Sequence, residues 1–121
     1  MKRLAITMLC FLALSGCATV ETVKKYWPRN HDPVMFGNLV DVELAITDID
    51  CNNADWSKSE AIARKLAVYT EWRKDPQAEN LRGLHRHTER MSKGGSKAFC
   101  ELGKKTAAQR IMAARSAWET R

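Results

Sequence analysis

Cysteine thiols are the most reactive side chains in this chain of 121 residues. The four cysteines are Cys10, Cys17, Cys51 and Cys100. The first two lie within or directly after a short apolar run near the N-terminus, whereas the other two lie in the more polar remainder. A thiol can be acylated, oxidised to a disulfide or bound to a metal ion, so its neighbours decide between these fates.

The N-terminal run has the parts of an export signal. Two basic residues are followed by residues 4–14, which are almost wholly apolar but too few to span a bilayer as a helix. A plain secretory signal would end in an A-x-A-like site. Here the run ends in Leu14-Ser15-Gly16-Cys17, which resembles the lipobox of bacterial lipoproteins. The resemblance covers residues 1–18, and the alternatives are an uncleaved hydrophobic tail or a chance match.

The resemblance implies a covalent lipid anchor: diacylglycerol on the Cys17 sulfur, cleavage before Cys17, and an acyl chain on the new amino group. Residues 1–16 would then be a signal peptide, 17–31 a flexible lipidated tether, and 32–121 the folded domain. Two or three acyl chains give a firm attachment to the bilayer. Because Ala18 rather than Asp follows the cysteine, the resemblance also implies the inner leaflet of the outer membrane, facing the periplasm.

Cys51 and Cys100 remain once the anchor is assigned, because Cys10 lies in the part that would be removed. The oxidising compartment of an exported protein favours a disulfide between them. Free thiols or a metal pair are the alternatives, but neither cysteine has a Cys or His at ligand spacing. The loop closed would hold about 50 residues, which in the chain-entropy model stabilises the fold by ~4 kcal/mol.

Arg82, Arg86 and Arg90 recur every four residues, so on a helix they stack on one face. Arginine binds phosphate and carboxylate in bidentate fashion, which makes this row a candidate site for an anion or an acidic partner. The alternatives are that the row faces an acidic helix of the same domain or simply solvent. Trp56, in a connection between helices, is either a binding anchor or a core residue.

The charge pattern favours pairing within the domain. Residues 32–56 hold six acidic and no basic side chains, whereas the chain from residue 57 onward holds 15 basic and seven acidic ones. An acidic first helix could therefore pack against basic later helices, or the basic surface could be offered to anionic lipid, lipopolysaccharide or an acidic protein. The net charge of +6 would ordinarily suggest nucleic acid. Export argues against that partner.

No pattern for catalysis or metal binding stands out. His85 and His87 are two residues apart, so on a helix they point nearly opposite ways and cannot chelate one ion together. The chain has no nucleophile elbow, P-loop, zinc-protease helix or dinucleotide fingerprint. We therefore expect neither an enzyme nor a metal or other cofactor beyond the lipid.

Apolar periodicity and helix-start signals predict four helices. Asp32-Pro33 starts the first, which ends near Asp50; Ser57 and Glu60 form a capping box for the second, which runs to residue 74. The third covers residues 76–93, and Ser96 caps the fourth. The predicted core positions are Met35, Leu39, Val42, Ile46 and Ile49; Ile62, Leu66, Tyr69 and Trp72; Ala78, Leu81, Leu84 or His85, Thr88 and Met91; and Phe99, Gly103, Ala107, Ile111, Ala114 and Trp118.

Short connections predict an all-α, up-down-up-down four-helix bundle with one disulfide, preceded by the tether. In that topology the end of the first helix and the start of the fourth lie at the same end, where Cys51 and Cys100 would meet. The leading functional interpretation is a small, non-enzymatic envelope lipoprotein that binds another envelope protein, in an exclusion, inhibitor or adaptor role. The alternatives are binding of anionic lipid or lipopolysaccharide by the arginine row and, with less support, an outer-membrane spanin-like subunit in phage lysis.

Overall fold

Helix α2 (Pro33–Thr47) begins where two start signals coincide. Asp32 Oδ1 accepts hydrogen bonds from Val34 N at 3.0 Å and Met35 N at 3.2 Å, and proline occupies the first turn. The helix ends slightly before the predicted residue 50, with Asp48 at its C-cap. Acidic side chains oppose the helix dipole there, which favours an early end. The whole predicted stripe, Met35, Leu39, Val42, Ile46 and Ile49, is buried as expected.

Helices α3 (Ser57–Trp72) and α4 (Ala78–Ser92) begin differently from the prediction. The capping box of Ser57 is wrong: Ser57 is itself the first helical residue, and Asp55 Oδ1 accepts from its N–H at 2.9 Å and its hydroxyl at 2.6 Å. Likewise Asp75 Oδ1 accepts from Gln77 N at 2.7 Å, so α4 starts two residues later than expected. In both places the aspartate turns the chain before the helix instead of capping it.

Two predicted core positions are exposed instead. Trp72 is 79% exposed at the end of α3, because the buried side of that helix is rotated toward small residues, namely Ser59, Ala63, Ala67 and Thr70 beside Leu66. Phe99 is exposed in the first turn of α5 (Lys97–Glu119), and its neighbour Cys100 takes the buried position. Small side chains let adjacent helices approach closely, so the apolar pattern alone did not identify the packed face.

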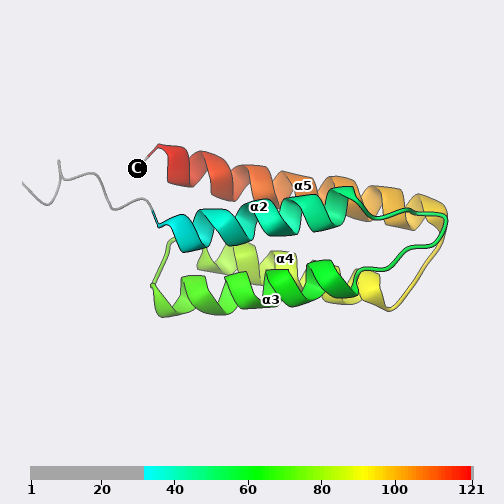
Figure 1. The fold of residues 1–121 in the computed structure, drawn as a ribbon, viewed down its shortest axis with the longest axis horizontal. Coiled ribbons are helices and arrows are strands. Elements are labelled where there is room, and N and C mark those ends of the chain that lie inside the picture. Colours follow the sequence, from blue (N-terminus) through cyan, green and yellow to red (C-terminus); the bar gives the residue numbers. More distant parts are fainter. Residues whose placement is uncertain (1–31, 121) are drawn as a thin grey trace, which may run out of the picture. The chain divides into compact units, whose positions relative to one another are not determined.

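The structure is a computed structural model, and it describes residues 32–120. Cys17 and the predicted signal peptide and tether lie outside this range. Within it the helices form a ring: α3 packs against α2 and α4, and α5 packs against α4 and α2. Figure 1 shows them antiparallel, with the connections 48–56 and 93–96 at one end and the 73–77 turn at the other. The predicted up-down-up-down bundle is confirmed, and residues 32–120 contain no strand.

The disulfide between Cys51 and Cys100 is present, with a Cα–Cα distance of 5.6 Å. It joins the segment that follows α2 to the first turn of α5, as the topology requires. Of the four packed helix pairs, α2 and α5 have the least packing, so this covalent link closes the weakest side of the ring. The α2–α5 pair is also held by an ion pair between Glu43 and Arg115.

Loss of the disulfide is predicted to cost about 4 kcal/mol of unfolding free energy, since the bond spans 49 positions. Denaturant unfolding of the double variant Cys51→Ser/Cys100→Ser should show this loss, and reductant should reproduce it in the unsubstituted chain. Reductant should have no effect on the double variant, which is the control. An unchanged midpoint for the unsubstituted chain in reductant would contradict the assignment.

Two glycines are predicted to respond oppositely to alanine. Gly37 lies on the exposed side of α2, and a Cβ there would meet nothing within 4 Å. Gly37→Ala should therefore stabilise the folded domain by about 1 kcal/mol, because alanine has the higher helix propensity. A Cβ on Gly103 would lie 2.6 Å from the buried Met91 Sδ, so Gly103→Ala should destabilise by about 1 kcal/mol or more through overpacking. Thermal unfolding of the two variants checks these predictions: the melting temperature should rise for Gly37→Ala and fall for Gly103→Ala. A higher melting temperature for Gly103→Ala would contradict the close packing of Gly103 against Met91.

Candidate functional site

The arginine row lies on the outer side of α4, where Arg82, Arg86 and Arg90 are exposed. Two of the three already have carboxylate partners: Arg82 contacts Glu71 and Glu79, each at 2.6 Å, and Arg86 contacts Glu79 at 3.2 Å. The hydrogen bond with Glu71 raises the pKa of Arg82. The row therefore faces solvent rather than the acidic α2, and most of its positive charge is neutralised within the domain.

Charge pairing between α2 and later elements does occur. Arg115 of α5 pairs with Glu43, and Arg73, just after α3, lies 3.4 Å from Asp32. Lys104 Nζ donates to the Thr47 and Ile49 carbonyls at 3.0 and 2.8 Å, and so satisfies the negative end of α2. The acidic start of the domain and its basic remainder are thus partly complementary, as the charge pattern predicted.

The two histidines have separate partners. His87 Nε2 lies 2.8 Å from the Gly103 carbonyl oxygen, and His85 Nε2 lies 3.5 Å from a carboxylate oxygen of Glu60. In residues 32–120, no three His, Cys, Asp or Glu side chains are grouped so that they could hold a metal ion.

Trp56 corrects an interpretation that the sequence left open. Its side chain is only 2% exposed, so it is a core residue and not an exposed binding anchor. Its ring contacts the His87 ring edge-on, with a centroid distance of 6.3 Å. Ser59 Oγ donates to the Trp56 carbonyl oxygen at 2.8 Å, which holds the start of α3 over this position. Trp56 belongs to the hydrophobic core cluster, together with Cys51, Met91 and Cys100.

An exposed apolar surface runs beside the contact of α2 with α5. Val40 and Leu44 on α2 are 49% and 55% exposed, and Met112 on α5 is 60% exposed. Val40 shares a helix face with Glu43, and Met112 shares one with Arg115, because each pair is three residues apart. Since Glu43 and Arg115 pair across the two helices, Val40 and Met112 border the same seam, and Leu44 lies next to Val40, one turn further along the outer side of α2. We call these three side chains the α2–α5 face.

Sequence reasoning missed this face, although a signal for it was present. It followed only the stripe of α2 that begins at Met35. Val40 and Leu44, on the side of α2 away from that stripe, are also apolar, so α2 has apolar residues on two sides. A surface helix of a globular domain buries one apolar side against the core, and Val40 and Leu44 on the other side of α2 stay about half exposed.

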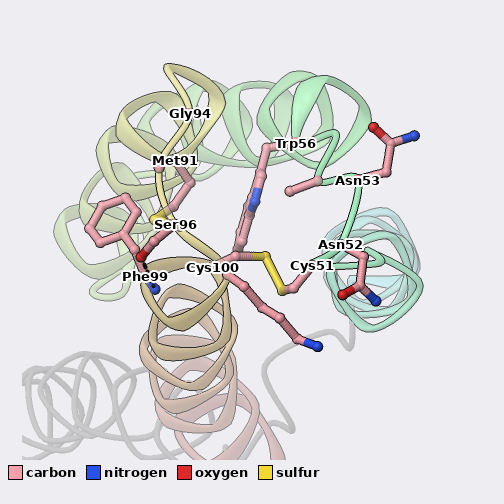
Figure 2. Close-up of a pocket in the computed structure, with 12 residues that line it drawn as sticks. Cys51, Asn52, Asn53, Trp56, Met91, Gly94, Ser96, Phe99 and Cys100 are labelled. Carbon is pink, nitrogen blue, oxygen red and sulfur yellow. Dashed lines mark hydrogen bonds between the residues drawn. A yellow bond between two sulfur atoms is a disulfide. The ribbon is translucent and has the colours of Figure 1, made fainter.

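A cleft of about 400 Å³ lies at the disulfide end of the bundle, between the two connections (Figure 2). The loop after α2, Trp56, Met91 of α4 and the start of α5 line it. Nearby, hydrogen bonds from Asn52 lower the pKa of the Asp50 carboxyl, and the charges of Lys97 and Lys104 act in the same direction. The sequence predicted that Cys51 and Cys100 would meet here but gave no sign of the cleft.

Comparisons with protein-family models, curated proteins and solved structures find no match to this chain. Within residues 32–120, no helix combines the length and the apolar character that crossing a bilayer requires. Three features of the chain bear on its function: the lipobox-like segment, the α2–α5 face and the end cleft.

Proposed function

We propose that the protein is a non-enzymatic envelope lipoprotein, anchored in the bilayer through Cys17, whose helical domain binds another envelope protein at the α2–α5 face. Support for the anchor comes from the basic start, the apolar run and Leu14-Ser15-Gly16-Cys17. Placement in the inner leaflet of the outer membrane, facing the periplasm, is part of the same proposal and depends on Ala18.

One observation carries the binding role: Val40, Leu44 and Met112 are each about half exposed or more, with Val40 and Met112 on either side of the seam and Leu44 one turn from Val40. Exposed apolar surface on a stable domain marks an interaction site when it is contiguous and has a polar border. This surface is flanked by exposed charges. Asp41 and Asp48, seven residues apart, share a side of α2 beside Leu44, and Lys105 shares a side of α5 with Met112.

The flanking charges define the kind of partner. Among the described residues, neither Asp41 nor Asp48 forms an ion pair, so both are available to basic side chains. An amphipathic helix could lay an apolar stripe along the seam and place Lys or Arg over these two carboxylates. We infer that the partner is an envelope protein that presents such a helix. The alternative role for the arginine row, binding anionic lipid, has less support because Glu71 and Glu79 occupy Arg82 and Arg86.

The lipid anchor predicts a strict dependence on one thiol. In a bacterial host given a labelled fatty acid, the full chain should incorporate label and sediment with membranes, whereas Cys17→Ser should do neither. Cys10→Ser is the matched control and should behave like the unsubstituted chain, because Cys10 lies in the segment that would be removed. Labelling of Cys17→Ser, or an equal effect of Cys10→Ser, would contradict the lipobox assignment.

The binding role predicts a contact specific to the α2–α5 face. A photo-crosslinking amino acid at Leu44 of the full chain should give an adduct with one envelope protein, and mass spectrometry should map it to an amphipathic helix bearing basic residues. The same amino acid at Val68, also exposed and apolar but on α3, is the control and should give no such adduct.

Affinity for the mapped helix then tests the chemistry. A synthetic copy should bind the purified chain, and Leu44→Asp should raise its Kd at least about tenfold, since losing a central apolar contact costs more than 1 kcal/mol. Val68→Asp should leave the Kd unchanged. Adducts between two copies of this chain would show that the face serves self-association, and equal adduct yields from positions 44 and 68 would overturn the proposal.

A further inference from the structure

The end cleft contains a buried donor without a partner. In the described part of the chain, Trp56 Nε1 is the buried side-chain nitrogen or oxygen that has no hydrogen-bond partner. The indole N–H is a donor only, so burying it without an acceptor carries a desolvation penalty. Trp118, the other buried tryptophan among these residues, donates its Nε1 to Asp75 Oδ1 at 3.2 Å. The comparison shows that the fold can satisfy a buried indole, and that at Trp56 it does not.

The unsatisfied donor belongs to Trp56, one of the residues that line the cleft. Figure 2 shows the Trp56 ring in the middle of the lining residues, between Met91 and the Cys51–Cys100 disulfide. A volume of about 400 Å³ is in the range of small-ligand sites. The nitrogen itself is covered, so binding to it requires a side-chain movement that opens it to the cleft.

The rest of the lining favours negative charge. Helix α5 begins at the cleft: Ser96 caps it, with its Oγ accepting from Phe99 N at 3.1 Å, and Lys97 follows in the lining. The first turn of a helix carries a partial positive charge, and its free N–H groups bind anions. Gly94 brings the chain into this turn with φ of 93°, a left-handed conformation that suits glycine. The lining contains Lys97 and no acidic side chain.

We propose that the cleft binds a carboxylate, with Trp56 Nε1 as the buried donor and the start of α5 with Lys97 as the source of positive charge. An acceptor oxygen on the ligand would satisfy the indole, and its charge would suit the helix terminus. The carboxylate can belong to a small organic acid or to the C-terminus of a peptide, because both fit the volume. This site is independent of the α2–α5 face, and its failure would leave the proposed function untouched.

The test uses the full chain, labelled with ¹⁵N, and follows the Trp56 indole N–H resonance, which Trp56→Phe identifies by its loss. Four probes are titrated: acetate, N-acetyl-Ala-Ala with a free carboxylate, the same peptide as its amide, and inorganic phosphate. We expect the free-acid peptide to shift the Trp56 resonance in a saturable way and the amide not to. If acetate shifts the Trp56 resonance in the same way, the cleft binds carboxylates in general. If acetate has no effect, the cleft recognises the C-terminal end of a peptide.

Variants separate the site from general charge effects. Lys97→Met should raise the Kd for the free-acid peptide about tenfold, the loss expected for one charge-assisted contact. Lys105→Met, on α5 but outside the cleft, should leave it unchanged. Trp56→Phe should abolish binding if it folds; if it does not fold, the Lys97→Met and Lys105→Met pair decides. Equal shifts from acid and amide, a response to phosphate alone, no response from Trp56, or equal effects of the two lysine variants would overturn the proposal.

Discussion

Closure of the α2–α5 seam is the constraint on which the rest of the bundle depends. These are the first and last of the described helices, far apart in the sequence, and they share less packing than the other neighbouring pairs. Links are spread along the whole seam: the disulfide at one end, Lys104 on the α2 carbonyls, the Glu43–Arg115 ion pair, and the Phe36 and Trp118 rings with centroids 5.5 Å apart. These contacts stabilise the α2–α5 pair in place of the larger buried apolar surface that a more closely packed helix pair would have.

Both candidate surfaces are consequences of how this seam is closed. Because polar and covalent links hold α2 to α5, the apolar side chains beside them are not needed for packing and stay exposed. The disulfide also joins the loop after α2 to the start of α5, and the cleft lies at this link with Trp56 in its lining. The way in which the seam is closed therefore leaves two surface features: the apolar α2–α5 face along the bundle and the cleft at its end.

Local signals made much of the fold predictable. Asp32-Pro33, the stripe that begins at Met35, and the Ser96 cap depend only on neighbouring residues, and the structure contains all of them. The disulfide was predictable because two cysteines allow one pairing and the topology places both at one end. The errors came where a distant or competing contact decides: Asp55 takes the place of the Ser57 box, and small residues turn Trp72 outward.

The candidate sites were less accessible to sequence reasoning. Spacing correctly grouped Arg82, Arg86 and Arg90, but Glu71, which neutralises part of the row, comes from another helix. The unsatisfied Trp56 nitrogen is a property of three-dimensional packing, and no residue pattern reports it. The α2–α5 face could have been found by examining the side of α2 opposite its core stripe, since Val40 and Leu44 stand there at helical spacing.

Asp32 would have a mechanical consequence if the chain is held through Cys17, as proposed. Its carboxylate serves the first turn of α2, accepts from the Tyr69 hydroxyl at 3.1 Å and lies beside Arg73. Tension entering the domain at this residue is therefore shared between α2 and the end of α3 from the outset. If α2 does peel away, the disulfide passes the load from Cys51 directly to Cys100, so residues 52–99 are not extended by that pull. With the proposed anchor at Cys17, two helices would resist the load at its point of entry, and the disulfide would keep residues 52–99 from being extended.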